Sequence, residues 1–323
     1  MLTYRTLPTP LALALTLATF TLFTIGEVPL TVFAQFITLV FALWALSYSI
    51  QSTTEQLGTT RFVNIFLIPW LTTLPETISA IQLARAGYPL AGALTFAGSA
   101  VFDLGLVLVI LGFRHQLTKS LAIAKVVALP LILAFIFSKQ NGIFVVHGTW
   151  LGVVLIAICI GVTLWASLGE GFFKPQLSRV ELVATVITWI ASIISFTYMC
   201  FTYASFLESM CELLPQSWVG IANAYLTSLP DAIYAGVLRE KGEVDEAIGE
   251  LWSCVIHDYT EVPGFALLFG GTLQLTLPEL IYVATVPFIF MLPLWLSKWE
   301  IKPGTAIALI TLFIAYTIWA LYL

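Results

Sequence analysis

The chain contains few charged residues. Only 10% of its 323 residues are Asp, Glu, Lys or Arg, whereas 59% are hydrophobic and the mean hydropathy is +0.98. A soluble domain carries roughly 25% charged residues, so this chain cannot cover a water-facing surface with polar groups. The composition therefore excludes a soluble globular protein and predicts an integral membrane protein with the lipid bilayer as its surroundings.

Other features that define common protein classes are also missing. There is no basic tail, so nucleic acid is not an expected partner. The four cysteines lack C-x-x-C spacing and argue against a structural zinc site or a disulfide framework; they are Cys159, Cys200, Cys211 and Cys254. No organic cofactor is expected, and the sequence does not specify an oligomeric state.

Long apolar runs dominate the chain. A helix needs about 20 mostly apolar residues to cross a bilayer. Eleven segments qualify, at residues 8–26, 28–50, 62–84, 88–113, 118–138, 143–168, 179–206, 216–238, 244–270, 276–297 and 303–323. The first segment could instead be a signal peptide, although no clear A-x-A cleavage site follows it. We predict an all-α integral membrane protein with about 11 transmembrane helices.

The positions of the basic residues predict the orientation. With the N-terminus in the cytoplasm, ten fall in inner loops, namely Arg5, Arg61, Arg114, Lys119, Lys174, Arg179, Arg239, Lys241, Lys298 and Lys302. Arg85 and Lys139 fall in outer loops, and Lys125 lies within a span. This positive-inside bias predicts a multi-pass protein of the cell membrane, with the N-terminus cytoplasmic and the C-terminus outside.

An internal repeat organises the chain. The stretch LTTLPETISAIQLARAG, from Leu71, aligns without a gap on LTSLPDAIYAGVLREKG, from Leu226. At the same offset Asp103 meets Asp258 and Ser99 meets Cys254. The two copies lie five predicted spans apart, an odd number, so they cross the membrane in opposite directions. This pattern is typical of an inverted-topology repeat, in which transporters place the substrate site near the midplane.

The repeat divides the chain into two halves. We predict an extra N-terminal helix (1–27), a first half (28–168) with the repeat motif at 71–103, a linker (169–178), and a second half (179–323) with the motif at 226–258. The predicted fold is therefore two inverted repeats of five helices plus one extra helix.

Each repeat motif combines a helix break with a carboxylic acid. Pro75 has no N–H for the carbonyl of Leu71, and Pro230 has none for that of Leu226. In lipid, a carbonyl freed in this way needs a partner inside the protein or in a cavity, and a bound cation is such a partner.

Polar side chains accompany these breaks at helical spacing. Residues four apart share one helix face, and four such pairs occur: Thr72 with Glu76, Thr227 with Asp231, Ser99 with Asp103, and Cys254 with Asp258. Hard cations such as Ca²⁺ take six to eight oxygen ligands of these kinds. The structural alternative is pairing with Arg or Lys, but neither occurs in the inner thirds of these spans. Four converging acids cannot all stay ionised without a cation, so protons are candidate counter-ions.

These motifs resemble those of the cation/calcium exchanger superfamily, which includes sodium/calcium exchangers. The family pattern is G-T-S-L-P-E followed by G-N-x-x-G-S-x-x-x-N/D. Here it reads LTTLPE with LTFAGSAVFD, and LTSLPD with IGELWSCVIHD. The resemblance covers the ten spans after the first and is most specific at the repeats.

The resemblance implies roles for particular residues. Glu76 and Asp231 would be the central divalent-cation ligands. The divalent and monovalent sites would be completed by Thr72, Thr73, Thr227, Ser228, Asp103 and Asp258. Ser99 and Cys254 stand where family serines help to bind sodium. The spans at 28–50 and 179–206 would be long gating helices that slide across the core.

The chain departs from the family pattern at several positions. Leu71 and Leu226 replace the first glycine. Thr95 and Glu250 replace the asparagine, so Glu250 adds a fifth acid to the candidate metal ligands. Cys254 supplies a thiol, which is a poor sodium ligand because sulfur is softer than oxygen. The sequence therefore leaves both Na⁺ and H⁺ open as counter-ions.

The function predicted from these residues is secondary cation antiport, with Ca²⁺ exchanged for Na⁺ or H⁺ by alternating access. Antiport of Mg²⁺ or Mn²⁺ against H⁺ is the alternative, and an intramembrane enzyme or a passive cation channel are further ones. No GxGD, HExxH or GxSxG motif supports an enzyme. His257, next to Asp258, is either a proton-linked neighbour of the site or a structural residue.

Overall fold

The computed structural model describes residues 62–117, 138–140, 143–146, 148–167, 197, 200 and 203–323. The predicted spans at 8–26 and 28–50, the linker at 169–178, and most of the spans at 118–138 and 179–206 lie outside the described residues. The two predicted gating helices are therefore not tested by this structure.

Helices occupy the described part of each remaining predicted span. In the first half they are η1 (Val63–Leu67), α3 (Ile68–Thr72), α4 (Leu74–Ala86), α5 (Pro89–Phe102), η2 (Asp103–Val107), α6 (Leu108–Gly112) and α9 (Thr149–Ser167). In the second half they are α11 (Gln216–Thr227), α12 (Leu229–Glu240), α13 (Val244–Leu268), α14 (Leu277–Leu296) and α15 (Pro303–Leu321). Residues 203–213 are also helical, so this helix runs past the predicted end at 206.

Four helical stretches among the described residues are long and apolar enough to cross a membrane by length and composition. They are Pro89–Gly112, Thr149–Ser167, Leu277–Leu296 and Pro303–Leu321. Shorter or acid-bearing helices such as α4, α12 and α13 lie among them. The apolar helices supply a lipid-facing exterior: Trp150, Leu296 and Ile307 are each more than half exposed.

The prediction of an all-α fold is wrong in one detail, because a small antiparallel sheet caps one end. Strands β1 (Ser138–Gln140), β2 (Ile143–Val146) and β3 (Leu273–Leu275) pair in the order β1-β2-β3. The predicted helical span at 143–168 is wrong at its start, where the first residues form β2. The physical reason is local. Gln140 pairs with Ile143 across an Asn-Gly sequence, the preferred two-residue hairpin connection.

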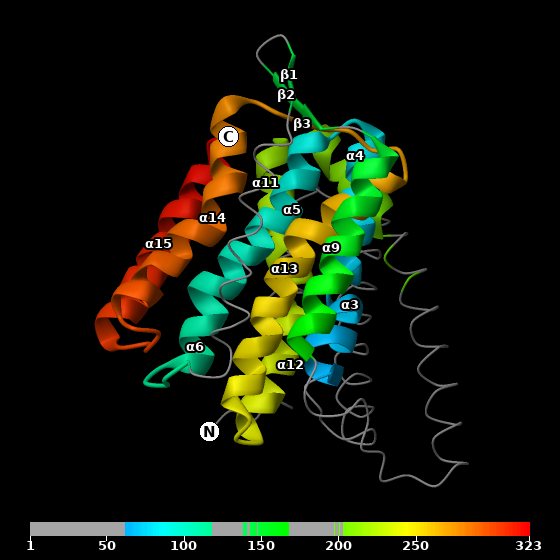
Figure 1. The fold of residues 1–323 in the computed structure, drawn as a ribbon. Coiled ribbons are helices and arrows are strands. Elements are labelled where there is room, and N and C mark those ends of the chain that lie inside the picture. Colours follow the sequence, from blue (N-terminus) through cyan, green and yellow to red (C-terminus); the bar gives the residue numbers. More distant parts are fainter. Residues whose placement is uncertain are drawn as a thin grey trace, which may run out of the picture.

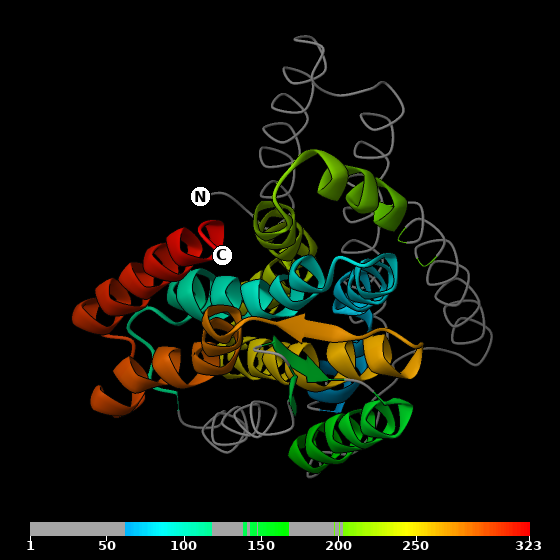
Figure 2. The same ribbon diagram turned by 90° about the horizontal axis from the view of Figure 1, so that it is seen from above.

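The core of the molecule is built around α5 and α13, which contact each other (Figure 1). Helices α4, α9, α11 and α12 pack around this pair, while α14 and α15 lie together on one side, as the view from above shows (Figure 2). Glycines permit the closest of these contacts. A Cβ on Gly98 of α5 would lie 2.7 Å from the Cβ of Ala224, and one on Gly220 of α11 would lie 2.8 Å from the Ala91 carbonyl oxygen. Small residues of this kind are how membrane helices approach closely.

The described loops gather at two ends of the bundle. At one end, His115 Nε2 lies 3.1 Å from Asp245 Oδ1, and the Arg114 N–H donates to the Ile301 carbonyl over 2.9 Å. This end therefore joins the loops after α6, α12 and α14, which hold Arg114, Lys241, Lys298 and Lys302. The opposite end holds the sheet and the loop after α4, with Arg85 and Lys139 nearby. The loops predicted to share a side of the membrane thus lie at one end.

Candidate cation site

Two broken helices frame the centre of the bundle. The first break is at Thr73, between α3 and α4, with φ −84° and ψ 0°. The second is at Ser228, between α11 and α12, with φ −77° and ψ −3°. Pro75 and Pro230 occupy the first turn of the helix that follows each break, where a missing N–H leaves no helical bond unmade. The two breaks have almost the same geometry at equivalent positions of the repeat.

The two broken helices run in opposite directions. From α3 to α4 the chain rises toward the sheet end, whereas from α11 to α12 it descends toward the other end (Figure 1). In this view the junctions of α3 with α4 and of α11 with α12 both lie between the two ends of the bundle (Figure 1). Glu76 and Asp231 are the acids of the first turn after each break, and an electrostatic interaction joins them.

Four acids converge on this region from four elements. Glu76 comes from α4, Asp103 from the start of η2, Asp231 from α12 and Asp258 from α13, and all four are completely buried. Electrostatic interactions join Glu76 to Asp231 and Asp258, and Asp103 to the other three. The structure thus brings together acids from both halves of the chain, although Glu76 and Asp258 lie far apart in the sequence.

The carboxylate oxygens of these four acids have no hydrogen-bond partner at normal geometry among the described residues, although the hydroxyls of Thr72, Thr227 and Ser99 and the thiol of Cys254 lie beside them. Among the described residues, no side chain or backbone group donates a hydrogen bond to any of the eight oxygens of Glu76, Asp103, Asp231 and Asp258. A buried carboxylate without a partner costs several kcal/mol. Such a cluster is stable only when positive charge occupies it, and a bound cation or added protons meet that need.

Hydroxyl groups complete the surroundings of the acids. Thr72 Oγ1 lies 3.3 Å from the Ile68 carbonyl, and Thr227 Oγ1 lies 2.8 Å from the Asn223 carbonyl. A hydroxyl that donates to its own helix keeps an oxygen lone pair free for a bound cation. Thr72 faces Asp231, and Thr227 faces Glu76, the acid of the opposite half.

Further predicted residues join the two halves directly. Ser99 Oγ and Ser228 Oγ lie 2.7 Å apart. Thr72 Oγ1 lies 3.7 Å from Cys254 Sγ, and Cys254 donates to Glu250 Oε1 over 3.3 Å. Nine of the eleven predicted ligands, all except Thr73 and Glu250, belong to these facing pairs or to the four acids. Glu250 joins the cluster through Cys254.

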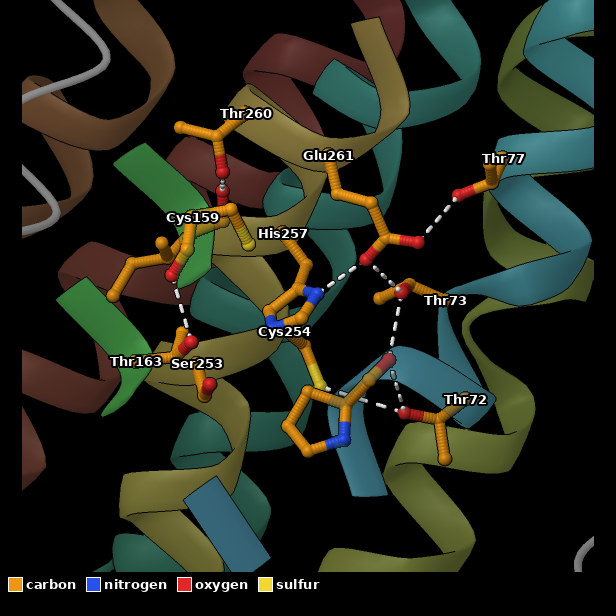
Figure 3. Close-up of polar contacts among 12 residues, drawn as sticks. Thr72, Thr73, Thr77, Cys159, Thr163, Ser253, Cys254, His257, Thr260 and Glu261 are labelled. Carbon is orange, nitrogen blue, oxygen red and sulfur yellow. Dashed lines mark hydrogen bonds and ion pairs between the residues drawn. The ribbon is translucent and has the colours of Figure 1, made fainter. Parts of the chain in front are cut away.

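Thr73 has different neighbours from its repeat partner Ser228. Its hydroxyl lies 2.6 Å from the Pro69 carbonyl and 3.2 Å from Glu261 Oε2, so it borders a second polar cluster (Figure 3). In that cluster His257 Nδ1 bonds Glu261 Oε2, and Thr77 donates to Glu261 Oε1 over 3.2 Å. His257 and Glu261 are fully or almost fully buried.

Glu261 is a buried acid at the border of the site that the sequence analysis missed. The signal was present, because His257 and Glu261 are four apart on one helix, a spacing at which opposite charges pair. A comparison of the two repeats does not identify the His257–Glu261 pair, since the equivalent residues of the first half are the apolar Phe102 and Leu106. The pairing supports the structural interpretation of His257.

The helical bundle that surrounds the buried acids shares its fold with solved cation exchangers. The model of the family described as "Sodium/calcium exchanger protein" matches residues 192–322. The H⁺/Ca²⁺ exchanger CAX is similar over 100% of this chain and 93% of its own, with 14% identity and a TM-score of 0.71. The sodium-calcium exchanger NCX_Mj is similar over 88% of this chain and 97% of its own, with 16% identity and a TM-score of 0.62.

No match to this sequence was found among curated proteins. The family match lies in the second half of the chain, and the fold is shared with the two exchanger structures over 88% and 100% of the chain. The similarity in fold and the family match in the second half agree with the resemblance that the repeat motifs predict.

Proposed function

We propose that this protein is a secondary active antiporter that exchanges a divalent cation, Ca²⁺ in the first place, for Na⁺ or H⁺. The observation that carries the proposal is the set of eight buried carboxylate oxygens without a protein donor among the described residues. The divalent cation would be held by Glu76 and Asp231, with the hydroxyls of Thr72 and Thr227 beside them.

The charge of the site gives a physical reason for exchange. One divalent cation offsets two of the four carboxylate charges of Glu76, Asp103, Asp231 and Asp258. When it leaves, the remaining charges repel one another in a medium of low dielectric constant, where such interactions are strong. Sodium ions or protons must then bind before the site can become exposed to the other side of the membrane. Coupling follows from this requirement, because the fully ionised site is too costly to carry across.

Alternating access would use the opposed broken helices. Thr73 and Ser228 mark equivalent breaks in helices of opposite direction. An inverted pair of repeats has two related conformations in which the same central site opens to opposite sides. The predicted spans at 28–50 and 179–206 would be the gates that slide across this core. We further propose that the protein lies in the cell membrane with its N-terminus in the cytoplasm.

The counter-ion and the divalent cation are both part of the proposal. The two similar structures bear the names of a sodium-calcium exchanger and of an H⁺/Ca²⁺ exchanger, so the fold accommodates either counter-ion. Asp103 and Asp258 provide acids that take protons or bind sodium. Mg²⁺ or Mn²⁺ exchanged for H⁺ is the second candidate. Cys254, whose thiol stands where a sodium-binding hydroxyl is expected, favours H⁺ over Na⁺ as its counter-ion.

Isotope flux tests the proposal. Purified protein in liposomes should accumulate ⁴⁵Ca²⁺ when an outward Na⁺ or H⁺ gradient is imposed, and reversing the gradient should reverse the flux. Asp231→Asn should lower the initial rate about tenfold or more, since loss of even an indirect partner reduces metal affinity by that factor. Glu300→Gln, which removes only an exposed ion pair with Lys302, is the matched control.

Three results would contradict the proposal. They are the absence of gradient-driven uptake of any divalent cation, full activity of Asp231→Asn, and single-channel currents far above the turnover of a transporter.

A further inference from the structure

The part of the central site that comes from the second half of the chain has its own set of possible metal ligands. Asp231, Glu250 and Cys254 each offer one ligand atom, and these atoms lie within 4.8 Å of one another. All three side chains are completely buried. Thr72 Oγ1, 3.7 Å from Cys254 Sγ, adds a hydroxyl at the edge of the group.

The geometry fits one small tetrahedral cation. Zn²⁺ binds thiolate sulfur at about 2.3 Å and carboxylate oxygen at about 2.1 Å, which places sulfur and oxygen about 3.6 Å apart in a tetrahedron. Cys254 Sγ and Glu250 Oε1 are separated by 3.3 Å. Ca²⁺, by contrast, takes six to eight oxygen ligands and gains little from sulfur.

Several ligand atoms of this group lack partners. Both oxygens of Asp231 and Oε2 of Glu250 are buried and accept no hydrogen bond from any described residue. These unpartnered atoms, together with a sulfur directed at Glu250, point to a ligand with positive charge and an affinity for sulfur.

The first half does not offer the same chemistry. The residues equivalent to Asp231, Glu250 and Cys254 are Glu76, Thr95 and Ser99. The Thr95 hydroxyl donates to the Ala91 carbonyl over 2.9 Å and accepts from Asn223 Nδ2 over 2.9 Å. Ser99 is paired with Ser228. The first half therefore offers only oxygen ligands. The soft sulfur ligand of the second half comes from Cys254 and is not shared by the two copies of the repeat.

We propose that Asp231, Glu250 and Cys254 form a binding site for a thiophilic divalent cation of the zinc class. The inference rests on the proposed function and deepens it, since it names the chemical class of a further cation that the central site binds besides Ca²⁺. Affinity for divalent metals at such mixed sulfur and oxygen sites rises from Mn²⁺ through Co²⁺ toward the end of the series.

A second group of possible metal ligands is the rival in any test. Cys159, His257 and Glu261 also offer ligand atoms within 4.8 Å of one another. Here, however, Glu261 is satisfied: His257 and Thr73 bond one of its oxygens and Thr77 the other. The pairing of Glu261 with these groups indicates a structural role, although His257 Nε2 is buried without a hydrogen-bond partner among the described residues. The test therefore has to separate this group from the proposed site.

Co²⁺ absorption reads out the proposed site directly, because thiolate–Co²⁺ charge transfer gives a near-ultraviolet band. The full chain is prepared with Cys159, Cys200 and Cys211 changed to Ser, so that Cys254 is the remaining thiol. We expect one equivalent of Co²⁺ to produce the band. One equivalent of Zn²⁺ should abolish it, and a hundredfold excess of Ca²⁺ should leave it in place.

Two variants locate the binding. Cys254→Ser should remove the band and weaken Zn²⁺ binding about tenfold or more, since loss of even an indirect partner of a metal costs that factor. Glu250→Thr, which installs the residue of the first half, should weaken Zn²⁺ binding while keeping the band at higher Co²⁺. If the triple-Ser background does not fold, the difference spectrum between the wild-type chain and Cys254→Ser supplies the same readout.

The outcomes separate this inference from the proposed function. Absence of the band, its persistence in Cys254→Ser, or its loss on Cys159→Ser alone overturns the zinc-class site. Gradient-driven Ca²⁺ flux with an unchanged Zn²⁺-to-Ca²⁺ preference in Cys254→Ser also overturns it and leaves the antiporter standing. Absence of all divalent flux together with a Cys254-dependent band overturns the antiporter and leaves the metal site standing.

Discussion

The most informative residues are buried acids whose oxygens have no protein partner among the described residues. Glu76 and Asp231 can be recognised from sequence alone, because an acid next to a proline in an apolar run, with no basic residue nearby, is usually functional. Their surroundings are less predictable. Thr95 and Glu250 occupy equivalent positions, yet one is tied to Asn223 and the other joins a thiol. Which of two equivalent residues faces the site depends on packing between elements far apart in the chain.

The His257–Glu261 pair supports a prediction about stability. Glu261→Leu should lower the free energy of unfolding by about 3 kcal/mol, because it leaves His257 buried with a lost partner. The double variant His257→Phe/Glu261→Leu copies residues 102 and 106 of the first half and should recover most of that loss, since an apolar pair of similar size often replaces a buried ion pair without penalty. Thermal unfolding in detergent measures both. Equal losses in the single and double variants would show that the pair itself is not what stabilises this region.

Glu261 also shows a limit of prediction from the repeat. All eleven predicted ligands are buried in the structure, and most lie at the centre of the bundle. Glu261 was missed because its equivalent in the first half is apolar. Comparison of the two repeats identifies residues that both halves share. A feature present in one half alone must be found from local spacing, which here is the i, i+4 relation of Glu261 to His257.

At the scale of elements, the breaks at Thr73 and Ser228 place the acids. The prolines predict where each helix is interrupted, and the structure has both interruptions two residues earlier, with a helix restarting around the proline. The three-stranded sheet could be foreseen only in part. Asn141-Gly142 is a hairpin signal in the sequence, but β3 joins the sheet from residues 273–275, and such a long-range pairing leaves no local pattern.

Helix packing gives a second prediction with an internal control. Gly152 of α9 faces α13, where an added Cβ would lie 2.5 Å from the Gly264 carbonyl oxygen and 2.8 Å from the Leu268 nitrogen. Gly152→Ala should therefore push the helices apart and lower the free energy of unfolding by about 2 kcal/mol. Gly161 lies on the same helix with nothing within 4 Å of its added Cβ. Gly161→Ala should be neutral or stabilising by up to about 1 kcal/mol. Thermal unfolding in detergent compares them, and a greater loss in Gly161→Ala would refute the packing argument.

At the scale of the whole molecule, the loops that the structure describes separate into two ends with unequal basic charge. The sequence anticipates this separation because span length and loop charge obey simple rules. The number of spans in the whole chain stays a prediction, since several of them lie outside the described residues.

Orientation in the membrane is a third prediction. Lys241→Cys, at the end rich in basic residues, should react with an impermeant thiol reagent only from the cytoplasmic side. Gln274→Cys, on the exposed face of β3, should react only from outside. The native cysteines are buried and give little background. Labelling of right-side-out and inverted vesicles measures this, and the reverse pattern would invert the proposed topology.

The central claim is that the buried acids at mid-height of the bundle hold a divalent cation, and equilibrium binding tests it most directly. Isothermal titration calorimetry of the purified protein with Ca²⁺, Mg²⁺, Mn²⁺ and Na⁺ at two pH values should show saturable binding of at least one divalent cation to the wild-type chain. Binding should be lost in Asp231→Asn and kept in Glu300→Gln. Wild-type protein that binds no divalent cation, or Asp231→Asn protein that binds one as tightly as the wild type, would contradict the claim.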